Sequence, residues 1–338
     1  MSQRISQSTI RMTTPPSIKA FAAVVGKKEG EGPLGRCFDI VNDDTTFGEK
    51  TWEKSESRMQ TMAVSKLLEK AALSTPNVDV IFAGDLLNQC IGSTYGLRDL
   101  EIPFLGVFGA CSTMAEGLCL ASLFADNGIA TNAVAVTSSH FCTAERQFRL
   151  PLEYGGQRPP TAQWTVTGSG ALLVTNEQLA NAPKVRTVTI GKITDKGIKD
   201  ANNMGAAMAP AACSTIKAYF DDTREQVESF DAIVTGDLGD VGSKLLLDLL
   251  KREGLDISSR HTDCGMMIYN NEEQDTHAGA SGCGCSASVL CGYFLPRLMN
   301  GQLKKILFCA TGALMSPTSA QQGESIPGIC HAVEITAE

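Results

Sequence analysis

A cysteine in a glycine-containing turn is the residue of this chain best suited to chemistry. Cys111 follows the apolar segment 102–108 and precedes a stretch whose apolar spacing predicts a helix. Backbone N–H groups left unpaired at a helix N-terminus favour a thiolate over a thiol, and they also favour a bound carboxylate. Cys111 is therefore predicted to be a nucleophile or a ligand-pocket residue, and a buried structural cysteine is the alternative.

Further polar side chains come directly after segments that are predicted to be buried strands. Asp85, His140, Asp237 and Thr311 stand at or just after the ends of four such segments. In open α/β sheets, ligands lie outside the carboxyl ends of the strands. The sequence therefore predicts that these residues gather near Cys111. For Asp85 a second interpretation is open, since an aspartate also caps the helix that follows it.

The elements that position these residues occur twice. Residues 78–86 resemble residues 230–238, and Cys111 lies as far from Cys285 as Thr137 lies from Thr311. Each half predicts a strand, a short loop, a helix and a strand.

The apolar runs are continuous, as in buried parallel strands, and residues 59–71 and 216–220 have helical spacing. Asp79 and Asp231 are expected at the entry of corresponding strands. The pattern predicts two duplicated halves, residues 1–178 and 179–338, with right-handed crossovers and a doubly wound sheet.

Composition restricts the classes of function. The 338 residues are 43% hydrophobic and 20% charged, as in globular proteins, and a net charge of −8 argues against nucleic-acid binding. No segment approaches the ~20 apolar residues that cross a bilayer, and residues 1–17 lack the apolar core of a signal peptide. Several of the 12 cysteines lie in apolar runs, and the spacing of Cys283 and Cys285 is not that of zinc ligands. We expect reduced thiols and neither a metal nor a cofactor.

Two other features concern the surroundings of the site. The glycine-rich segments 168–170 and 279–284 match neither a P-loop nor a dinucleotide motif, so they predict close backbone approach at the centre of the sheet. Residues 141–163, which are rich in aromatic, arginine, glycine and proline residues, predict a long functional loop over the site.

Gly109-Ala110-Cys111-Ser112 resembles the nucleophile turn of thiolases and β-ketoacyl synthases, and the duplicated halves resemble theirs. Longer segments resemble the stage V sporulation protein AD family, thiolase-like proteins of spore formers. These segments are residues 83–89, 108–113, 137–140, 144–149, 153–157, 263–269 and 324–327. The resemblance runs over nearly the whole chain. It implies an α/β, thiolase-like fold in which two duplicated βαβαβ halves form a layered α/β/α/β/α core.

The resemblance also indicates that the usual catalytic set is incomplete. Ser281 stands where thiolases carry a histidine, and Asp237 stands near the place of a histidine in ketoacyl synthases. A serine is no neutral base near pH 7, and an aspartate beside a thiolate repels it. We expect a binding protein on an enzyme scaffold, without catalytic residues. The alternative is an active acyltransferase of the β-ketoacyl synthase or thiolase type that uses Cys111, with His140 or His331 as its base.

The family resemblance implies that the ligand is dipicolinic acid (pyridine-2,6-dicarboxylate), with or without calcium, taken up into the developing spore. Backbone N–H groups at 111–113 could hold one carboxylate. Arginine suits the other, with Arg146 and Arg149 as first candidates and Arg158 behind them. Pairing of these arginines with Glu145 or Glu153 on the surface is the alternative. The expected ligand-binding residues are Cys111, Asp85, Asn88, His140, Arg146, Ser281 and His331.

The resemblance further implies a homodimer. It implies a cytoplasmic protein that is held at the inner membrane of the developing spore by other stage V sporulation A membrane proteins. A scaffold for those proteins with a vestigial pocket is a third interpretation.

Overall fold

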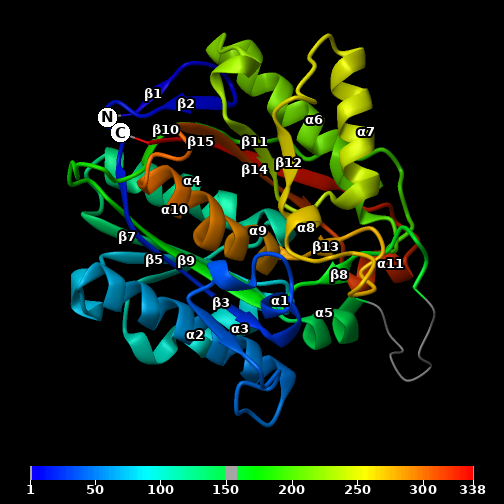
Figure 1. Ribbon diagram of the computed structural model, residues 1–338, viewed down its shortest axis with the longest axis horizontal. Coiled ribbons are helices and arrows are strands. Elements are labelled where there is room, and N and C mark those ends of the chain that lie inside the picture. Colours follow the sequence, from blue (N-terminus) through cyan, green and yellow to red (C-terminus); the bar gives the residue numbers. More distant parts are fainter. Residues whose placement is uncertain (1, 149–157, 338) are drawn as a thin grey trace.

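The computed structural model describes residues 2–148 and 158–337, and it arranges them in five layers (Figure 1). Helices cover the outer face of each of two layers of strands, and further helices lie between the strand layers. The outer helices are α2 (Trp52–Ala71) and α3 (Ile91–Leu97) on one side and α6 (Met204–Thr223) and α7 (Gly239–Arg252) on the other. The central helices are α4 (Thr113–Asp126), α9 (Cys283–Val289) and α10 (Leu295–Met299). The predicted α/β/α/β/α layering is confirmed.

The strands of the two halves correspond one to one. Those of the first half are β3 (Ser17–Gly26), β5 (Val80–Gly84), β6 (Phe104–Gly106), β7 (Asn132–Ser139) and β9 (Gly168–Thr175). Those of the second are β10 (Lys184–Thr189), β11 (Ala232–Thr235), β12 (His261–Asp263), β14 (Lys305–Ala313) and β15 (Gly328–Thr336). Their order across the sheet is β12-β11-β14-β15-β10-β3-β9-β7-β5-β6. The order reads the same from either edge, so the duplication inferred from the sequence is present in the topology.

The direction of the strands corrects one expectation. β5 is parallel to both β6 and β7, as β11 is to β12 and β14. β9 and β15, however, run antiparallel to their neighbours. Among these ten strands, direct parallel pairing is therefore confined to β5, β6 and β7 in the first half and to β11, β12 and β14 in the second.

Two corresponding aspartates hold the strand entries together. Asp79 Oδ2 accepts hydrogen bonds from the backbone N–H groups of Thr131 and Asn132 at 2.7 and 2.9 Å, where β7 begins. Asp231 Oδ2 accepts the matching pair from Lys304 and Lys305 at 2.5 and 2.9 Å, where β14 begins. The expected placement at strand entry is confirmed, and each carboxylate satisfies backbone donors that would otherwise be unpaired at the strand end.

Glycines allow the central helix α9 to touch the sheet. A Cβ atom at Gly170 of β9 would lie 2.4 Å from the Ala287 carbonyl oxygen, and one at Gly168 would lie 2.6 Å from Ser288 Oγ. Both distances are far below van der Waals contact, and at Gly170 the atoms met belong to backbone, so only glycine fits at that position. The predicted close approach of backbone is confirmed for this segment.

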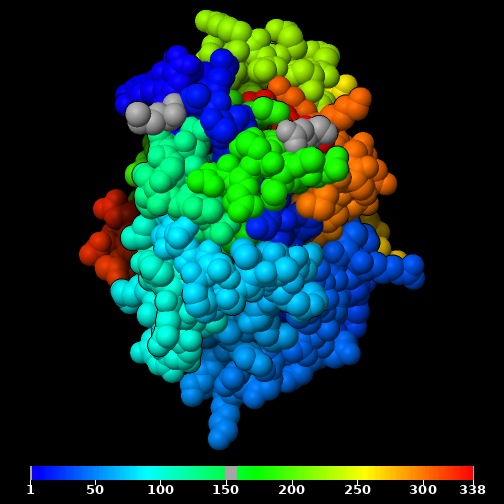
Figure 2. Space-filling model, turned by 90° about the vertical axis from the view of Figure 1, so that its left-hand side faces the viewer, coloured from blue at the N-terminus to red at the C-terminus, as the bar shows by residue number. Residues whose placement is uncertain are grey.

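The predicted boundary after residue 178 falls between β9 and β10. Near the N-terminus, β2 (Thr9–Arg11) crosses that division and pairs antiparallel with β10. In the space-filling view the N-terminal residues, in dark blue, accordingly lie against the second half at the top of the molecule (Figure 2).

Shorter elements complete the description. They are β1 (Gln3–Arg4), β4 (Ile40–Asn42), β8 (Trp164–Thr165), β13 (Ala280–Ser281), α1 (Lys27–Gly30), α5 (Phe141–Phe148), α8 (Cys264–Met267) and α11 (Pro317–Gln321). The prediction of a loop over residues 141–163 is wrong for residues 141–148, because these residues form the helix α5. Arg149 and Glu153 lie outside the described residues. In the described ranges, no helix combines the length and the apolar character that a membrane crossing requires.

Candidate functional site: a buried cysteine paired with an aspartate

Cys111 lies in a tight turn between β6 and α4. Residues Ala110–Ser112 form a 3₁₀ turn that runs directly into the helix, and Ala110 has a left-handed φ of 50°. Ser112 Oγ donates to the Gly109 carbonyl at 2.7 Å, and Thr113 Oγ1 donates to the Ala110 carbonyl at 2.6 Å. These bonds fix the turn and leave Cys111 buried, at 5% exposure. The predicted helix start is therefore a 3₁₀ turn just before the helix.

The second half of the chain brings a carboxyl group to this cysteine. Asp237 follows β11 and is fully buried. It accepts hydrogen bonds from the Gly282 backbone N–H at 2.9 Å, from Thr311 Oγ1 at 3.0 Å and from the Cys111 thiol. The two halves therefore meet at a cysteine and an aspartate that both follow strand ends.

The electrostatics of this pair correct the expectation of a thiolate. Burial first, and then the charge of Asp237, raise the pKa of the Cys111 thiol well above its usual range. Burial also raises the pKa of Asp237 to about 7, against the opposing effect of the hydrogen bonds from Cys111 and Gly282. The backbone N–H groups at the turn are outweighed because removal from water penalises the charged sulfur more strongly. Cys111 is a neutral thiol near pH 7.

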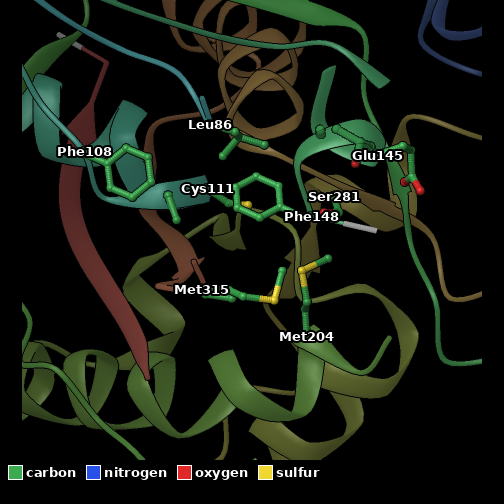
Figure 3. Close-up of a pocket in the computed structure, with 12 residues that line it drawn as sticks. Leu86, Phe108, Cys111, Glu145, Phe148, Met204, Ser281 and Met315 are labelled. Atoms are coloured by element: carbon green, nitrogen blue, oxygen red, sulfur yellow. The ribbon is translucent and has the colours of Figure 1, made fainter. Parts of the chain in front are cut away.

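A narrow pocket opens onto Cys111 (Figure 3). Its lining residues are Leu86, Phe108, Ala110, Cys111, Ala144, Glu145, Phe148, Thr165, Met204, Ser281, Ala313 and Met315. In the close-up, Met204 and Met315 face Cys111 and Phe148 from the opposite wall. The cavity volume is about 40 Å³, enough for roughly three water molecules. An aromatic ligand would have to displace some of these side chains.

Of the predicted ligand-binding residues, Cys111 and Ser281 line this pocket. Asp85 does not. Its Oδ1 accepts from the Leu87 N–H at 2.9 Å, and its Oδ2 accepts from the Ser93 N–H at 2.7 Å and from Ser93 Oγ at 2.6 Å. Because Ser93 lies in the first turn of α3, Asp85 caps that helix. The capping interpretation describes its geometry, and its carboxylate oxygens are directed at α3.

The two histidines considered as bases also point elsewhere. His140 donates from Nε2 to the Thr45 carbonyl at 2.9 Å, and its Nδ1 accepts from the Cys142 N–H at 3.2 Å. His331 Nδ1 accepts from the Gly191 N–H at 3.2 Å. Burial lowers the pKa of both imidazoles, that of His331 to about 4. Neither histidine is among the described residues that line the pocket, and no histidine is hydrogen-bonded to Cys111 in the described part of the chain.

The polar residues near the pocket rim have partners outside it. Arg146 forms an ion pair with Glu53 of α2, which is neither of the two partners considered from the sequence. The backbone N–H of Asn88, an exposed residue, donates to Gln147 Oε1 at 3.1 Å. The guanidinium carbon of Arg158 lies 4.6 Å from the centroid of the Trp164 ring. None of these three residues lines the pocket.

Sequence reasoning found part of the site and missed the rest. The expected position of Asp237 near Cys111 is confirmed, although Asp237 is not in the predicted set of ligand-binding residues. The apolar wall from Phe148, Met204 and Met315 is also absent from that set. In the sequence this wall is marked only by apolar residues next to segments predicted as loop. Such residues are too common to identify a pocket.

Chemically, the site offers a protonated thiol, a buried carboxyl group and a serine behind apolar walls. The described lining contains Glu145 but neither lysine nor arginine. Such a site can donate and accept hydrogen bonds to a ligand. In the described lining no histidine accompanies Cys111, and a histidine is the usual neutral base near pH 7.

The architecture is that of thiolase-like proteins. The structure of 3-oxoacyl-[acyl-carrier-protein] synthase III from Aquifex aeolicus VF5 superimposes with a TM-score of 0.58 at 13% identity, over 95% of this chain and 99% of that chain. A single-residue variant of OleA from Xanthomonas campestris superimposes with a TM-score of 0.62 at 15% identity, over 98% of this chain and 100% of that one. At these identities the likeness shows a shared fold.

Sequence similarity narrows the assignment within that class. The sequence pattern of stage V sporulation protein AD matches residues 6–336. The stage V sporulation protein AD of Bacillus subtilis (strain 168) is 46% identical over 319 residues, which cover 94% of each chain. The chain belongs to the stage V sporulation protein AD family.

Proposed function

We propose that this protein binds dipicolinic acid in the Cys111 pocket and supports its uptake into the developing spore without catalysing a reaction. The observation that carries the non-catalytic part is the burial of Cys111 beside the buried carboxyl group of Asp237, since burial and that charge both raise the pKa of the thiol. A thiolase-type reaction begins with attack by a thiolate, and this pairing keeps the proton on the sulfur. Membership of the stage V sporulation protein AD family supports dipicolinic acid as the ligand.

The pocket walls support a planar aromatic ligand. Phe108 and Phe148 can contact a pyridine ring, and the hydroxyl groups of Ser281 and Thr165 can donate to its carboxyl groups. Met204 and Met315 have flexible thioether chains, so they can move aside at low cost when the ligand enters. Ligand binding therefore requires rotamer changes in the opposite wall and leaves the sheet in place.

Calorimetric titration of the purified protein with dipicolinic acid tests this function. Saturable binding is expected, and Met204→Trp, which fills the cavity from the first residue of α6, should abolish it. Cys111→Ala should weaken it. Met299→Trp is the matched control, because Met299 is 39% exposed and lies on α10 outside the pocket. Saturable binding that Met204→Trp leaves unchanged would move the ligand to another site, and no saturation at millimolar ligand would refute the proposal.

An acyltransferase that uses Cys111 is the second candidate. The apolar walls favour it, since they could equally hold an acyl chain. Incubation with acyl-coenzyme A followed by intact-mass measurement separates the two functions. A mass increase that maps to Cys111 would establish covalent catalysis, and an unchanged mass together with dipicolinate binding would establish the binding protein.

We further propose that the chain forms a homodimer through β6, the last strand in the sheet order. Phe104 and Leu105 on this strand are 40% and 47% exposed, and Tyr95 on the preceding helix is 57% exposed. An exposed apolar edge strand attracts another strand, and a two-fold axis would pair β6 with β6 of a second copy. Phe108 lines the Cys111 pocket and is 45% exposed, so a second copy would also cover a pocket wall.

In the cell, we propose a cytoplasmic protein held at the inner membrane of the developing spore by the other stage V sporulation A membrane proteins. Family membership supports this location. If the chain served only as a scaffold, Met204→Trp would leave assembly with those proteins unchanged and no ligand would bind.

A further inference from the structure

A negative charge on Asp237 would repel any anion that enters the pocket. Asp237 interacts with the Cys111 thiol and accepts from the N–H of Gly282, the neighbour of Ser281, and both Cys111 and Ser281 line the pocket, so a ligand that touches the sulfur also comes close to this carboxyl group. Gly282 and Thr311 supply its other hydrogen bonds. All three donors are neutral, and none of them cancels a negative charge on Asp237.

Other groups around Asp237 do not supply a positive charge. Asp263 faces it from β12, and its pKa is raised to about 6 by burial. The thiols that face it from α8, α9 and β15 have raised pKa values and stay neutral; they are Cys264, Cys283, Cys285 and Cys330. In the described lining, the one ionisable carboxyl group is Glu145. A carboxylate ligand that contacts Cys111 is therefore close to the acidic side chains of Asp237, Asp263 and Glu145.

We propose that Asp237 is the residue that sets which charge the Cys111 pocket accepts, and that a dicarboxylate binds only when Asp237 carries a proton. Two negative charges a few ångströms apart in a buried site repel each other far more strongly than in water. The pair avoids this repulsion when Asp237 takes up one proton as the ligand enters. This inference rests on the proposed binding of a dicarboxylate in this pocket.

The sign of the pH dependence follows. The pKa of Asp237 is about 7 in the free protein. At pH 6 the carboxyl group is therefore already protonated, and ligand binding takes up few protons. Above pH 7 the free protein has lost the proton and must regain it to bind. The dissociation constant should then rise about tenfold per pH unit. Both carboxyl groups of dipicolinic acid are ionised throughout this range, as ordinary aromatic carboxylic acids are, so the ligand itself adds no slope.

The test is calorimetric titration with dipicolinic acid between pH 6 and pH 8.5, in buffers of different ionisation enthalpy. At pH 8 the wild type should take up about one proton per ligand bound and bind about tenfold more weakly than at pH 6. Asp237→Asn, which keeps the side-chain shape, should show neither the slope nor the proton uptake. Asp240→Asn is the matched control and should behave like the wild type, since Asp240 is paired with Lys244 at the start of α7.

The possible outcomes distinguish the role of Asp237 from the proposed binding function. Saturable binding that does not change between pH 6 and pH 8.5 would overturn the role of Asp237 and leave the binding function standing. Persistent proton uptake by Asp237→Asn would also overturn it, by assigning the proton to Asp263 or Glu145. If Asp237→Asn does not fold, the buffer dependence of the wild type alone still decides whether a proton is taken up. An absence of binding at every pH would refute the proposed function and this inference with it.

Discussion

Glu56 is a buried carboxyl group in the middle of the first-half layers, and its removal should change how stability depends on pH. It has no measurable exposure, at 0%. Oε1 accepts from Ser138 Oγ at 3.1 Å, and Oε2 lies 2.6 Å from Thr143 Oγ1. Burial first, and the neighbouring charge of Asp85 second, raise the pKa of Glu56 to about 8. The folded protein therefore keeps a proton on Glu56 at neutral pH.

The sign and size of the effect follow from linkage. A carboxyl group with a raised folded-state pKa contributes stability that is complete below the unfolded-state pKa and is lost as pH rises through the folded-state value. From pH 6 to pH 7.5 the unfolded chain has released this proton and the folded chain has not. The free energy of unfolding should fall by about 1.4 kcal/mol per pH unit from this group, or about 2 kcal/mol over the interval. For a chain of this length that corresponds to about 3 °C in melting temperature.

Glu56→Gln should remove this contribution while keeping a partner for each of the two side-chain contacts. Thr143 Oγ1 also lies 2.8 Å from the His140 carbonyl, so its hydroxyl can donate there and accept from the new amide. Melting temperatures of wild type and Glu56→Gln, measured between pH 6 and pH 7.5, should diverge by about 3 °C as pH rises. Glu69→Gln is the control, because Glu69 lies on the exposed side of the same helix and pairs with Lys66. Parallel curves for wild type and Glu56→Gln would refute the assignment of a raised pKa to Glu56.

Two further predictions concern the surface and the thiol. Leu105→Lys on β6 should convert a dimer to a monomer in analytical ultracentrifugation, while Ile129→Lys, at a residue that is 64% exposed elsewhere, should not; a monomeric wild type would contradict the proposed interface. At pH 7.5, iodoacetamide should modify the partly exposed Cys37 and Cys213 before the buried, protonated Cys111, as followed by peptide mapping. Preferential modification of Cys111 would indicate an activated nucleophile and favour the acyltransferase.

The two duplicated halves were predictable because their determinants are repeated and local, whereas the layering was implied by the family resemblance. Continuous apolar runs, helical spacing and the matched aspartates Asp79 and Asp231 each specify an element or its entry, and every one of them occurs in both halves. Strand direction was less accessible. The antiparallel direction of β9 and β15 depends on the end of the sheet at which each strand begins. Hydrophobic periodicity carries no information about that direction.

The sequence predicted the residues at the centre of the candidate site, Cys111 and Ser281, but not the apolar residues that form the pocket wall. The turn around Cys111 is specified by short local sequence, Ser281 was identified through the family resemblance, and both reach the pocket. His140 and Arg146 also follow a strand end, yet α5 begins there and turns their side chains toward Thr45 and Glu53. A helix in place of the expected loop rotates successive side chains by about 100°, so residue order alone could not show which of them would face Cys111.

Asp85 and Asp237 show how one duplicated position acquired two uses. Both follow corresponding strands, but α3 begins close to Asp85 and offers its N–H groups, which the carboxylate caps. In the second half, Asp263 of β12 takes that task, accepting from the N–H groups of Leu238 and Gly239 where α7 begins. Because a neighbouring acid caps the helix, Asp237 is free to face Cys111. Substitution of Asp263 should therefore lower stability by about 1–3 kcal/mol through loss of buried hydrogen bonds, whereas Asp237→Asn should act on the pH dependence of ligand binding.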